Sequence, residues 1–275
     1  MEYTGYKKIQ LQGEALAQFY EGAPCNFNLK ENEYLVLMDA EDHPIDKYVL
    51  QDGSLKRVDY KVIRSQMMGD IKPRNLEQEL AFHLLQDDKT KIKVLTGRYG
   101  SGKTMAMLVQ GINLLHQGIF KRIVYVRNNI NAKDSTDPGS LPGSIIDKLY
   151  PFLMPLADHL GGTDVLDDYI ENGTIEPIHL GYLRGRDLRH SLIYCTEAQN
   201  LTIDQIKLLI GRVGEGSELW LDGDFHAQVD RAVFEKSNGL RAIVEKFAGN
   251  KYFGYVHLVK SERSEVAALA DLLDG

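Results

Sequence analysis

Residues 92–104 read Ile-Lys-Val-Leu-Thr-Gly-Arg-Tyr-Gly-Ser-Gly-Lys-Thr, a short apolar run that leads into a glycine-rich loop. The apolar run predicts a strand, and the residues after the loop, Met105–Gln117, predict a helix. The loop, Gly97–Thr104, fits the pattern G-x-x-x-x-G-K-[ST]. In this pattern backbone N–H groups curl around phosphate oxygens, the lysine reaches the terminal phosphates, and the hydroxyl meets magnesium. The stretch therefore predicts a strand–loop–helix unit that binds ATP with magnesium.

Six residues of this loop are the predicted nucleotide contacts, and Lys103 is also a predicted catalytic residue. They are Gly97, Gly100, Ser101, Gly102, Lys103 and Thr104, with Thr104 as the predicted magnesium ligand.

Short apolar strands alternate with helices from Asn75 onward. The predicted strands are Ile92–Thr96, Ile123–Val126, Leu192–Cys195, Leu219–Leu221 and Tyr255–Val259. The predicted helices begin with one capped by Asn75, and continue with Lys103–Gln117, Gly143–Leu156, Ile203–Ile210 and Asn238–Phe247. Strands that alternate with helices predict an α/β fold, a P-loop NTPase with a parallel sheet covered on both faces. The turn-rich segment Asn129–Leu141 is a predicted functional loop.

The first 70 residues have a different pattern. Apolar runs at Tyr34–Met38, Lys47–Leu50 and Val58–Val62 are separated by turn residues, and the pattern of Gly13–Tyr20 predicts a helix. We expect a small, mostly antiparallel β module over residues 1–70, followed by the P-loop domain over residues 71–275.

Acidic residues follow two of the predicted strands. Glu197 comes just after Leu192–Cys195, where a carboxylate that orients a water belongs. Asp222-Gly223-Asp224 ends the next strand, and Gln228 follows closely. Ligands bind at the carboxyl ends of parallel strands, so these residues are candidates for a site at this edge. The simpler alternative is that they form ordinary turns.

Arginines provide further candidates, because phosphoryl transfer is helped by a guanidinium that neutralises developing charge. The candidates are Arg127, Arg184, Arg186, Arg189 and Arg263. Tyr182 lies beside the first two members of the Arg184–Arg189 group, so this segment either binds nucleic acid by stacking and phosphate contact or only tethers a loop.

The composition limits the function classes. The formal net charge of −7 argues against a protein coated in positive charge for non-specific binding to duplex DNA. No apolar run approaches the roughly 18 residues that a membrane span needs. The polar start, MEYTGYKKIQ, does not resemble a secretory signal, and we therefore expect a cytoplasmic protein with no membrane contact.

Many short stretches, in order, resemble the PhoH-like family of P-loop ATPases. Besides the phosphate loop, they are Lys72–Gln78, Ile123–Arg127, Leu141–Gly143, Tyr182–Arg186, Glu197–Asn200, Gly223–Asp224, Ser237–Leu240 and Ser261–Ser264. The similarity covers about residues 71–275. The N-terminal residues resemble the β segment that links a PIN ribonuclease domain to the ATPase in one branch of the family. We expect no PIN domain and no nuclease activity here.

The resemblance implies a helicase-like core, ATP hydrolysis, homo-oligomeric rings such as hexamers, and action on single-stranded RNA or DNA. By the same resemblance, Gln78 is similar to an adenine-reading glutamine and Gln228 to a γ-phosphate sensor. We expect Asp224 to monitor the γ-phosphate together with Gln228, and Glu197 to be the catalytic carboxylate that orients the water. Arg263 is similar to an arginine that completes a neighbour's site.

Two departures separate this chain from the family pattern. The family's strand ends in Asp-Glu-Ala-Gln, whereas this chain has Thr196, whose hydroxyl can hold a magnesium-bound water but carries no negative charge. The segment Gly223–Gln228 is one residue longer than the family's Gly-Asp-Pro-x-Gln and lacks its proline. Three alternatives follow: an active ATPase, a nucleotide-dependent oligomeric scaffold with weak hydrolysis, and, less favoured, a small-molecule kinase.

Overall fold

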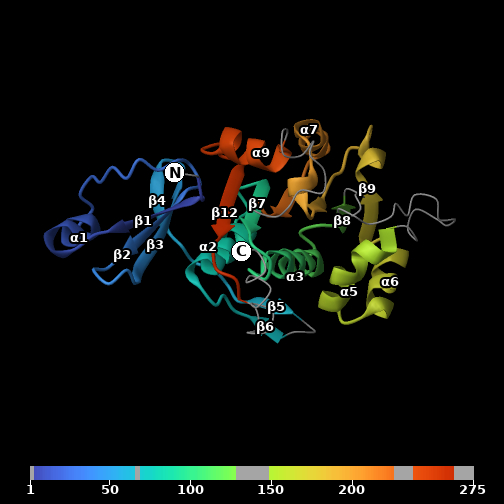
Figure 1. Cartoon of the computed structure of the whole chain (residues 1–275), viewed down its shortest axis with the longest axis horizontal. Coiled ribbons are helices and arrows are strands. Elements are labelled where there is room, and N and C mark those ends of the chain that lie inside the picture. The colour runs from blue at the N-terminus through green and yellow to red at the C-terminus, as the bar shows by residue number, and fades with distance from the viewer. Residues whose placement is uncertain (1–2, 66–68, 128–148, 226–237, 263–275) are drawn as a thin grey trace, which may run out of the picture.

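The computed structural model describes residues 3–65, 69–127, 149–225 and 238–262. Its centre is a six-stranded sheet in the order β12-β7-β11-β10-β8-β9, and every pair in it is parallel (Figure 1). The strands are β7 (Ile92–Gly97), β8 (Arg122–Arg127), β9 (Ile175–His179), β10 (Ser191–Cys195), β11 (Glu218–Gly223) and β12 (Phe253–Leu258). The five predicted strands are present, and β9 is an addition.

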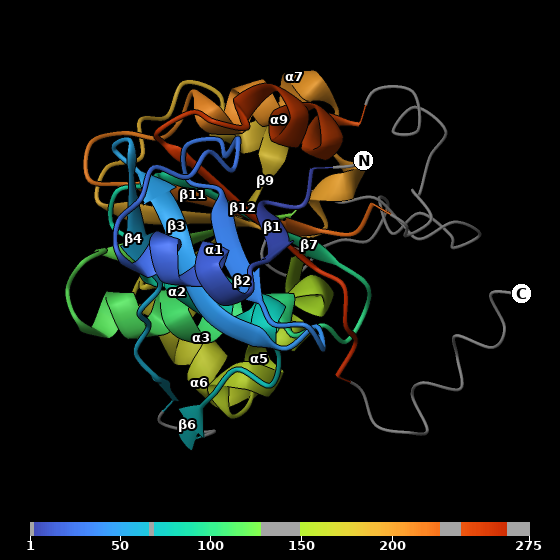
Figure 2. The ribbon, with the colours of Figure 1, turned by 90° about the vertical axis from the view of Figure 1, so that its left-hand side faces the viewer.

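Helices cover both faces of this sheet (Figures 1 and 2). One face carries α2 (Leu76–Gln86), α3 (Lys103–His116), α5 (Met154–Leu160) and α6 (Thr163–Glu171), and the other carries α7 (Ile203–Ile210) and α9 (Gly239–Phe247). Alternate residues of each strand enter different apolar clusters: Leu95 packs on the α2–α3 side and Val94 on the α7–α9 side. The predicted α/β fold with a doubly covered parallel sheet is confirmed.

Between the sheet and these helices the chain makes three short 3₁₀ segments. They are η2 (Tyr150–Leu153), η3 (Leu180–Leu183) and η4 (Ala198–Asn200). In its described part, the predicted helix Gly143–Leu156 is η2 followed by α5, with prolines at positions 151 and 155. The predicted loop Asn129–Leu141 lies outside the described residues. Within the described ranges, none of the helices has the length and apolar character that crossing a bilayer requires.

The N-terminal residues form a small sheet in the order β1-β2-β3-β4. Its strands are β1 (Tyr6–Gln10), β2 (Tyr34–Met38), β3 (Pro44–Gln51) and β4 (Ser54–Arg57), and α1 (Gly13–Tyr20) connects the first two. The β2–β3 and β3–β4 pairs are antiparallel as predicted, whereas β1 pairs with β2 in parallel. The predicted strand Val58–Val62 is wrong, because the chain instead runs on to a separate hairpin, β5 (Ile63–Ser65) with β6 (Gly69–Ile71).

This module lies beside the β12 edge of the central sheet (Figure 1), and the backbone N–H of His257 on β12 donates to the carbonyl of Thr4. The buried side-chain amide of Asn32 donates to the carbonyls of Asn250, Lys251 and Phe253, in the segment that enters β12. Buried residues of β2 and α2 also belong to one apolar cluster. The module and the P-loop part are therefore in direct contact, and a division of the chain near residue 70 stays a prediction.

Candidate functional site

The phosphate loop joins β7 to α3, as its sequence predicts. β7 ends at Gly97, and α3 begins at Lys103 with Gly102 as its N-cap in a left-handed conformation (φ 88°). At Gly97 φ is 151°, and a Cβ would lie 2.3 Å from the carbonyl oxygen of Leu258. Glycine is required there because β12 passes directly against the loop. The loop thus leads into the N-terminus of a 14-residue helix, a position that favours bound anions.

The ammonium group of Lys103 lies within the loop that it belongs to. Its Nζ donates to the carbonyl oxygens of Gly97 at 2.6 Å and Arg98 at 3.0 Å. Ser101 is fully buried, and its hydroxyl lies 3.4 Å from the same Nζ. A phosphate entering the loop would meet this positive charge together with the N–H groups of the first turn of α3.

Asp222, the next-to-last residue of β11, is the central acid of the site. One carboxylate oxygen, Oδ2, accepts hydrogen bonds from Thr104 Oγ1 at 2.9 Å and Tyr194 OH at 2.6 Å. The other, Oδ1, accepts from the backbone N–H of Glu197 at 3.0 Å. The side chain is only 2% exposed. The sequence marked the Asp222–Asp224 segment as a candidate site but gave Asp222 no role, because it did not show that this carboxylate meets Thr104.

Glu197 follows β10 and has an unusual backbone. Its φ and ψ of 56° and 39° place it in the left-handed region, which is uncommon for a residue with a side chain and often marks functional sites. Burial raises the pKa of its carboxyl group above the usual value, and the nearby charge of Asp222 raises it further. The hydrogen bond from Gln199 Nε2, 2.6 Å from Glu197 Oε2, acts in the opposite direction.

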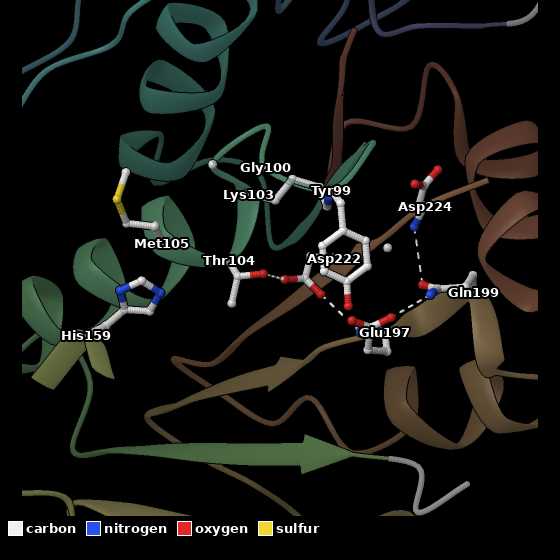
Figure 3. Close-up of a pocket in the computed structure, with 12 residues that line it drawn as sticks. Tyr99, Gly100, Lys103, Thr104, Met105, His159, Glu197, Gln199, Asp222 and Asp224 are labelled. Carbon is white, nitrogen blue, oxygen red and sulfur yellow. Dashed lines mark hydrogen bonds between the residues drawn. The ribbon is translucent and has the colours of Figure 1, made fainter. Parts of the chain in front are cut away.

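Gln199 connects this carboxylate to the end of β11. Besides donating to Glu197, its Oε1 accepts from the backbone N–H of Asp224 at 3.2 Å. Glu197, Gln199, Asp222 and Asp224 line one cavity, which has a volume of about 220 Å³. Figure 3 shows these four side chains near one another at the ends of β10 and β11 and in η4. Lys103 and Thr104 line the same cavity from the loop side, together with the exposed ring of Tyr99. The predicted residues Lys103, Thr104, Glu197 and Asp224 therefore face a common space.

The predicted adenine-reading residue, Gln78, contacts the loop itself. Its Nε2 donates to the carbonyl oxygen of Ser101 at 3.0 Å, and its Oε1 accepts from the backbone N–H of Arg74 at 2.8 Å. Asn75 caps α2 by accepting from the backbone N–H of Gln78 at 3.0 Å. The start of α2 is thus tied to the phosphate loop. These two bonds use one N–H and one lone pair of the Gln78 amide, which has two of each.

The remaining candidates divide into three groups. Thr196 is buried beside the site but is not among the residues that line the cavity. Gln228 and Arg263 lie outside the described residues, so their roles stay predictions. Of the arginine group, Arg186 pairs with Glu176 through two hydrogen bonds, of 2.5 and 3.1 Å, and Arg189 pairs with Asp187 at 2.7 Å. Arg184 is exposed.

The oxygen donors of the site suit magnesium bound together with a nucleotide. Thr104 offers a hydroxyl and Asp222 a carboxylate, and Mg²⁺ prefers such hard oxygen ligands. Among the described residues, no three His, Cys, Asp or Glu side chains gather into a metal cage. The pair of Thr104 and Asp222 fits an ion that keeps several waters and is held by one or two side chains plus phosphate oxygens.

Comparisons with known proteins identify the family. The family profile described as PhoH-like protein matches residues 70–270. A protein named PhoH2 from Bacillus subtilis is 33% identical over 98% of this chain and 64% of its own length. PhoH2 proteins from Mycolicibacterium smegmatis and Thermobispora bispora are 34% and 31% identical, over 72% and 97% of this chain and 46% and 62% of theirs. The chain thus spans less than two thirds of these relatives, and it belongs to the PhoH-like protein family.

Proposed function

We propose that this chain is a magnesium-dependent ATPase that acts on single-stranded RNA as a cytoplasmic homo-oligomer. The observation that carries the ATPase proposal is the convergence of Lys103, Thr104 and Glu197 on one cavity at the carboxyl edge of the parallel sheet. Lys103 and the loop N–H groups would hold the phosphates, and Thr104 would face magnesium. When bound, magnesium would neutralise charge on the terminal phosphates.

Glu197 is the residue best placed to orient a water for attack. Its carboxylate lines the cavity and is held by Gln199, so its position is fixed before any ligand enters. Asp224 and Gln228 would sense the γ-phosphate, and Gln78 would contact the base. Arg263 from an adjacent subunit would neutralise charge in the transition state, which is why we include a ring, such as a hexamer, in the proposal.

The RNA part of the proposal depends on the segment around η3. The ring of Tyr182 is 59% exposed, and Arg184 is exposed two residues further on. An exposed aromatic ring can stack on a base while a neighbouring guanidinium contacts phosphate. Because Arg186 and Arg189 are paired with carboxylates, this proposal uses Tyr182 and Arg184 rather than the whole arginine group.

A nucleotide-dependent scaffold is the second candidate, and Thr196 is the observation that favours it. Phosphate release by wild type, Lys103→Ala and Thr196→Asp separates the two. An ATPase gives clear turnover that Lys103→Ala abolishes, because the phosphates lose their cationic contact. A scaffold gives almost no turnover in wild type and a gain in Thr196→Asp.

Adding single-stranded RNA to the same assay tests the second half of the proposal. We expect the ATPase rate or the oligomeric state to change with RNA, and we expect Tyr182→Ala to weaken that response. Tyr252→Ala is the matched control, since Tyr252 is similarly exposed (52%) at the turn before β12. If rate and oligomeric state were both indifferent to single-stranded RNA and DNA, the nucleic-acid proposal would be wrong.

A further inference from the structure

The acid that contacts the hydroxyl of the phosphate loop lies on β11 and not at the end of β10. At the end of β10, where the family has aspartate, this chain has Thr196, which is buried and does not line the cavity. The described acids that do line it are Glu197, Asp222 and Asp224. We propose that Asp222, on the neighbouring strand β11, supplies the carboxylate that faces magnesium in place of the residue at position 196. This inference rests on the proposed function, because it concerns the same nucleotide site.

The hydrogen bond between Thr104 and Asp222 carries the argument. A hydroxyl has one proton to donate and two lone pairs. Thr104 Oγ1 donates its proton to Asp222 Oδ2, 2.9 Å away, so its lone pairs remain available to a cation. By accepting this proton, Asp222 orients the Thr104 hydroxyl as a metal ligand. The Asp222 carboxylate would then lie beside the ion that Thr104 binds.

The sheet explains how one strand can substitute for another. β10 and β11 are parallel neighbours, and their register pairs Cys195 with Leu221. Thr196 directly follows β10, and Asp222 is the next-to-last residue of β11, so the two residues lie beside each other at the same edge of the sheet. Neighbouring strands lie about 4.8 Å apart. A carboxylate on β11 is therefore at the same edge of the sheet as one at the end of β10 would be. β11 is also the strand paired directly with β7, which leads into the phosphate loop.

Other groups of the site hold Asp222 in place. Tyr194, on β10, donates to Oδ2, and the backbone N–H of Glu197 donates to Oδ1. Glu197, whose backbone is left-handed, is thus the residue whose N–H donates to Asp222. Donors from α3, β10 and the turn after β10 thus fix the carboxylate. Its one remaining lone pair, on Oδ1, can accept from a water of a magnesium ion.

The test is the gain in nucleotide affinity that magnesium produces. The dissociation constant of a fluorescent ATP analogue is measured with Mg²⁺ and with EDTA for each variant. For Asp222→Asn we expect the magnesium-dependent gain to fall by about tenfold or more, as for other groups that position metal ligands, with little change in EDTA. Asp204→Asn, which removes an exposed acid on α7, is the charge-matched control and should behave as wild type.

Thr196→Asp in the otherwise unchanged chain tests the inference without altering the buried Asp222. If Asp222 already supplies the charge, a second carboxylate beside it brings no further magnesium gain and repels the first. In Thr196→Asp/Asp222→Asn, by contrast, part of the gain should return. A full gain retained in Asp222→Asn, a clear increase in Thr196→Asp alone, or no magnesium gain in wild type would each overturn the inference.

These outcomes remain distinct from a failure of the proposed function. If wild type shows the magnesium gain, and loses it in Asp222→Asn, but releases no phosphate, the ATPase proposal fails while the role of Asp222 stands. If wild type releases phosphate and Asp222→Asn keeps the full gain, the role of Asp222 fails while the ATPase proposal stands.

Discussion

At the scale of single residues, the left-handed backbone of Glu197 connects strain with function. A residue with a Cβ loses about 1–2 kcal/mol in this conformation, whereas glycine adopts it readily. The conformation aims the Glu197 N–H at Asp222 while the side chain lines the cavity. The strained residue therefore carries one carboxylate of the site and, through its backbone N–H, holds the other, that of Asp222.

Glu197→Ala and Glu197→Gly should separate the side chain from the backbone. Both remove the carboxylate, so both should lower phosphate release by at least about a hundredfold while nucleotide binding persists. Both also lose the bond from Gln199, so they differ chiefly in backbone strain. We expect Glu197→Gly to exceed Glu197→Ala in unfolding free energy by about 1 kcal/mol in urea denaturation. Equal stability of the two would show that the left-handed conformation is not imposed at this position.

Residues whose role depends on a local pattern could be predicted from the sequence, and Asp222 shows why others could not. The loop Gly97–Thr104 is contiguous, so its spacing alone identifies the lysine and the hydroxyl. Asp222 acquires its role only because β11 lies between β7 and β10 and its side chain reaches Thr104, which is 118 positions away in the chain. The sequence showed an acid at the end of an apolar strand, and this indicates a candidate site. It does not indicate that Thr104 is the hydrogen-bond partner of Asp222.

At the scale of elements, the same distinction holds. The helix α7 has the predicted bounds, Ile203–Ile210, because its start is encoded locally. The strand β9 contains Pro177, and a proline weakens a strand prediction because it lacks a backbone N–H. An edge strand tolerates proline, since only one of its sides pairs with a neighbouring strand, and β9 is at the edge of the sheet. The strand β1 was missed because it is partly exposed, and it exists by pairing with β2.

The N-terminus of α7 offers a clean test of local encoding. Thr202 Oγ1 accepts from the Gln205 N–H at 3.3 Å, and Gln205 Oε1 accepts from the Thr202 N–H at 2.9 Å. Thr202→Ala should lower the unfolding free energy by about 1 kcal/mol, because the cap is lost. Thr202→Ser keeps the hydroxyl and should retain most of the stability. If urea denaturation gave Ala and Ser the same stability, the capping bond would contribute nothing in this context.

At the scale of the whole molecule, the N-terminal module and the P-loop part share buried structure. The hydroxyl of Tyr34, on β2, lies 3.0 Å from Nδ1 of His83, on α2, and the two rings pack edge to face. Burial lowers the pKa of His83 below its usual value. The neighbouring carboxylates of Asp87 and Asp59 raise this pKa and the ammonium group of Lys93 lowers it, but burial is the largest effect. Burial thus favours the neutral form of this imidazole at the junction.

The stability of the whole chain should therefore decrease in mild acid. The folded pKa of His83 is below the unfolded value of about 6.5, so the unfolded chain binds the proton first. Stability from the neutral imidazole is complete above about pH 6.5 and is lost as the pH falls toward the folded pKa, by at most about 1.4 kcal/mol per pH unit. Urea denaturation of wild type, His83→Gln and His43→Gln between neutral pH and about pH 5 checks this. His83→Gln should flatten the dependence, whereas His43→Gln, at a side chain 71% exposed, should leave it as in wild type. Parallel curves for wild type and His83→Gln would assign the acid sensitivity to other groups and remove the junction from the explanation.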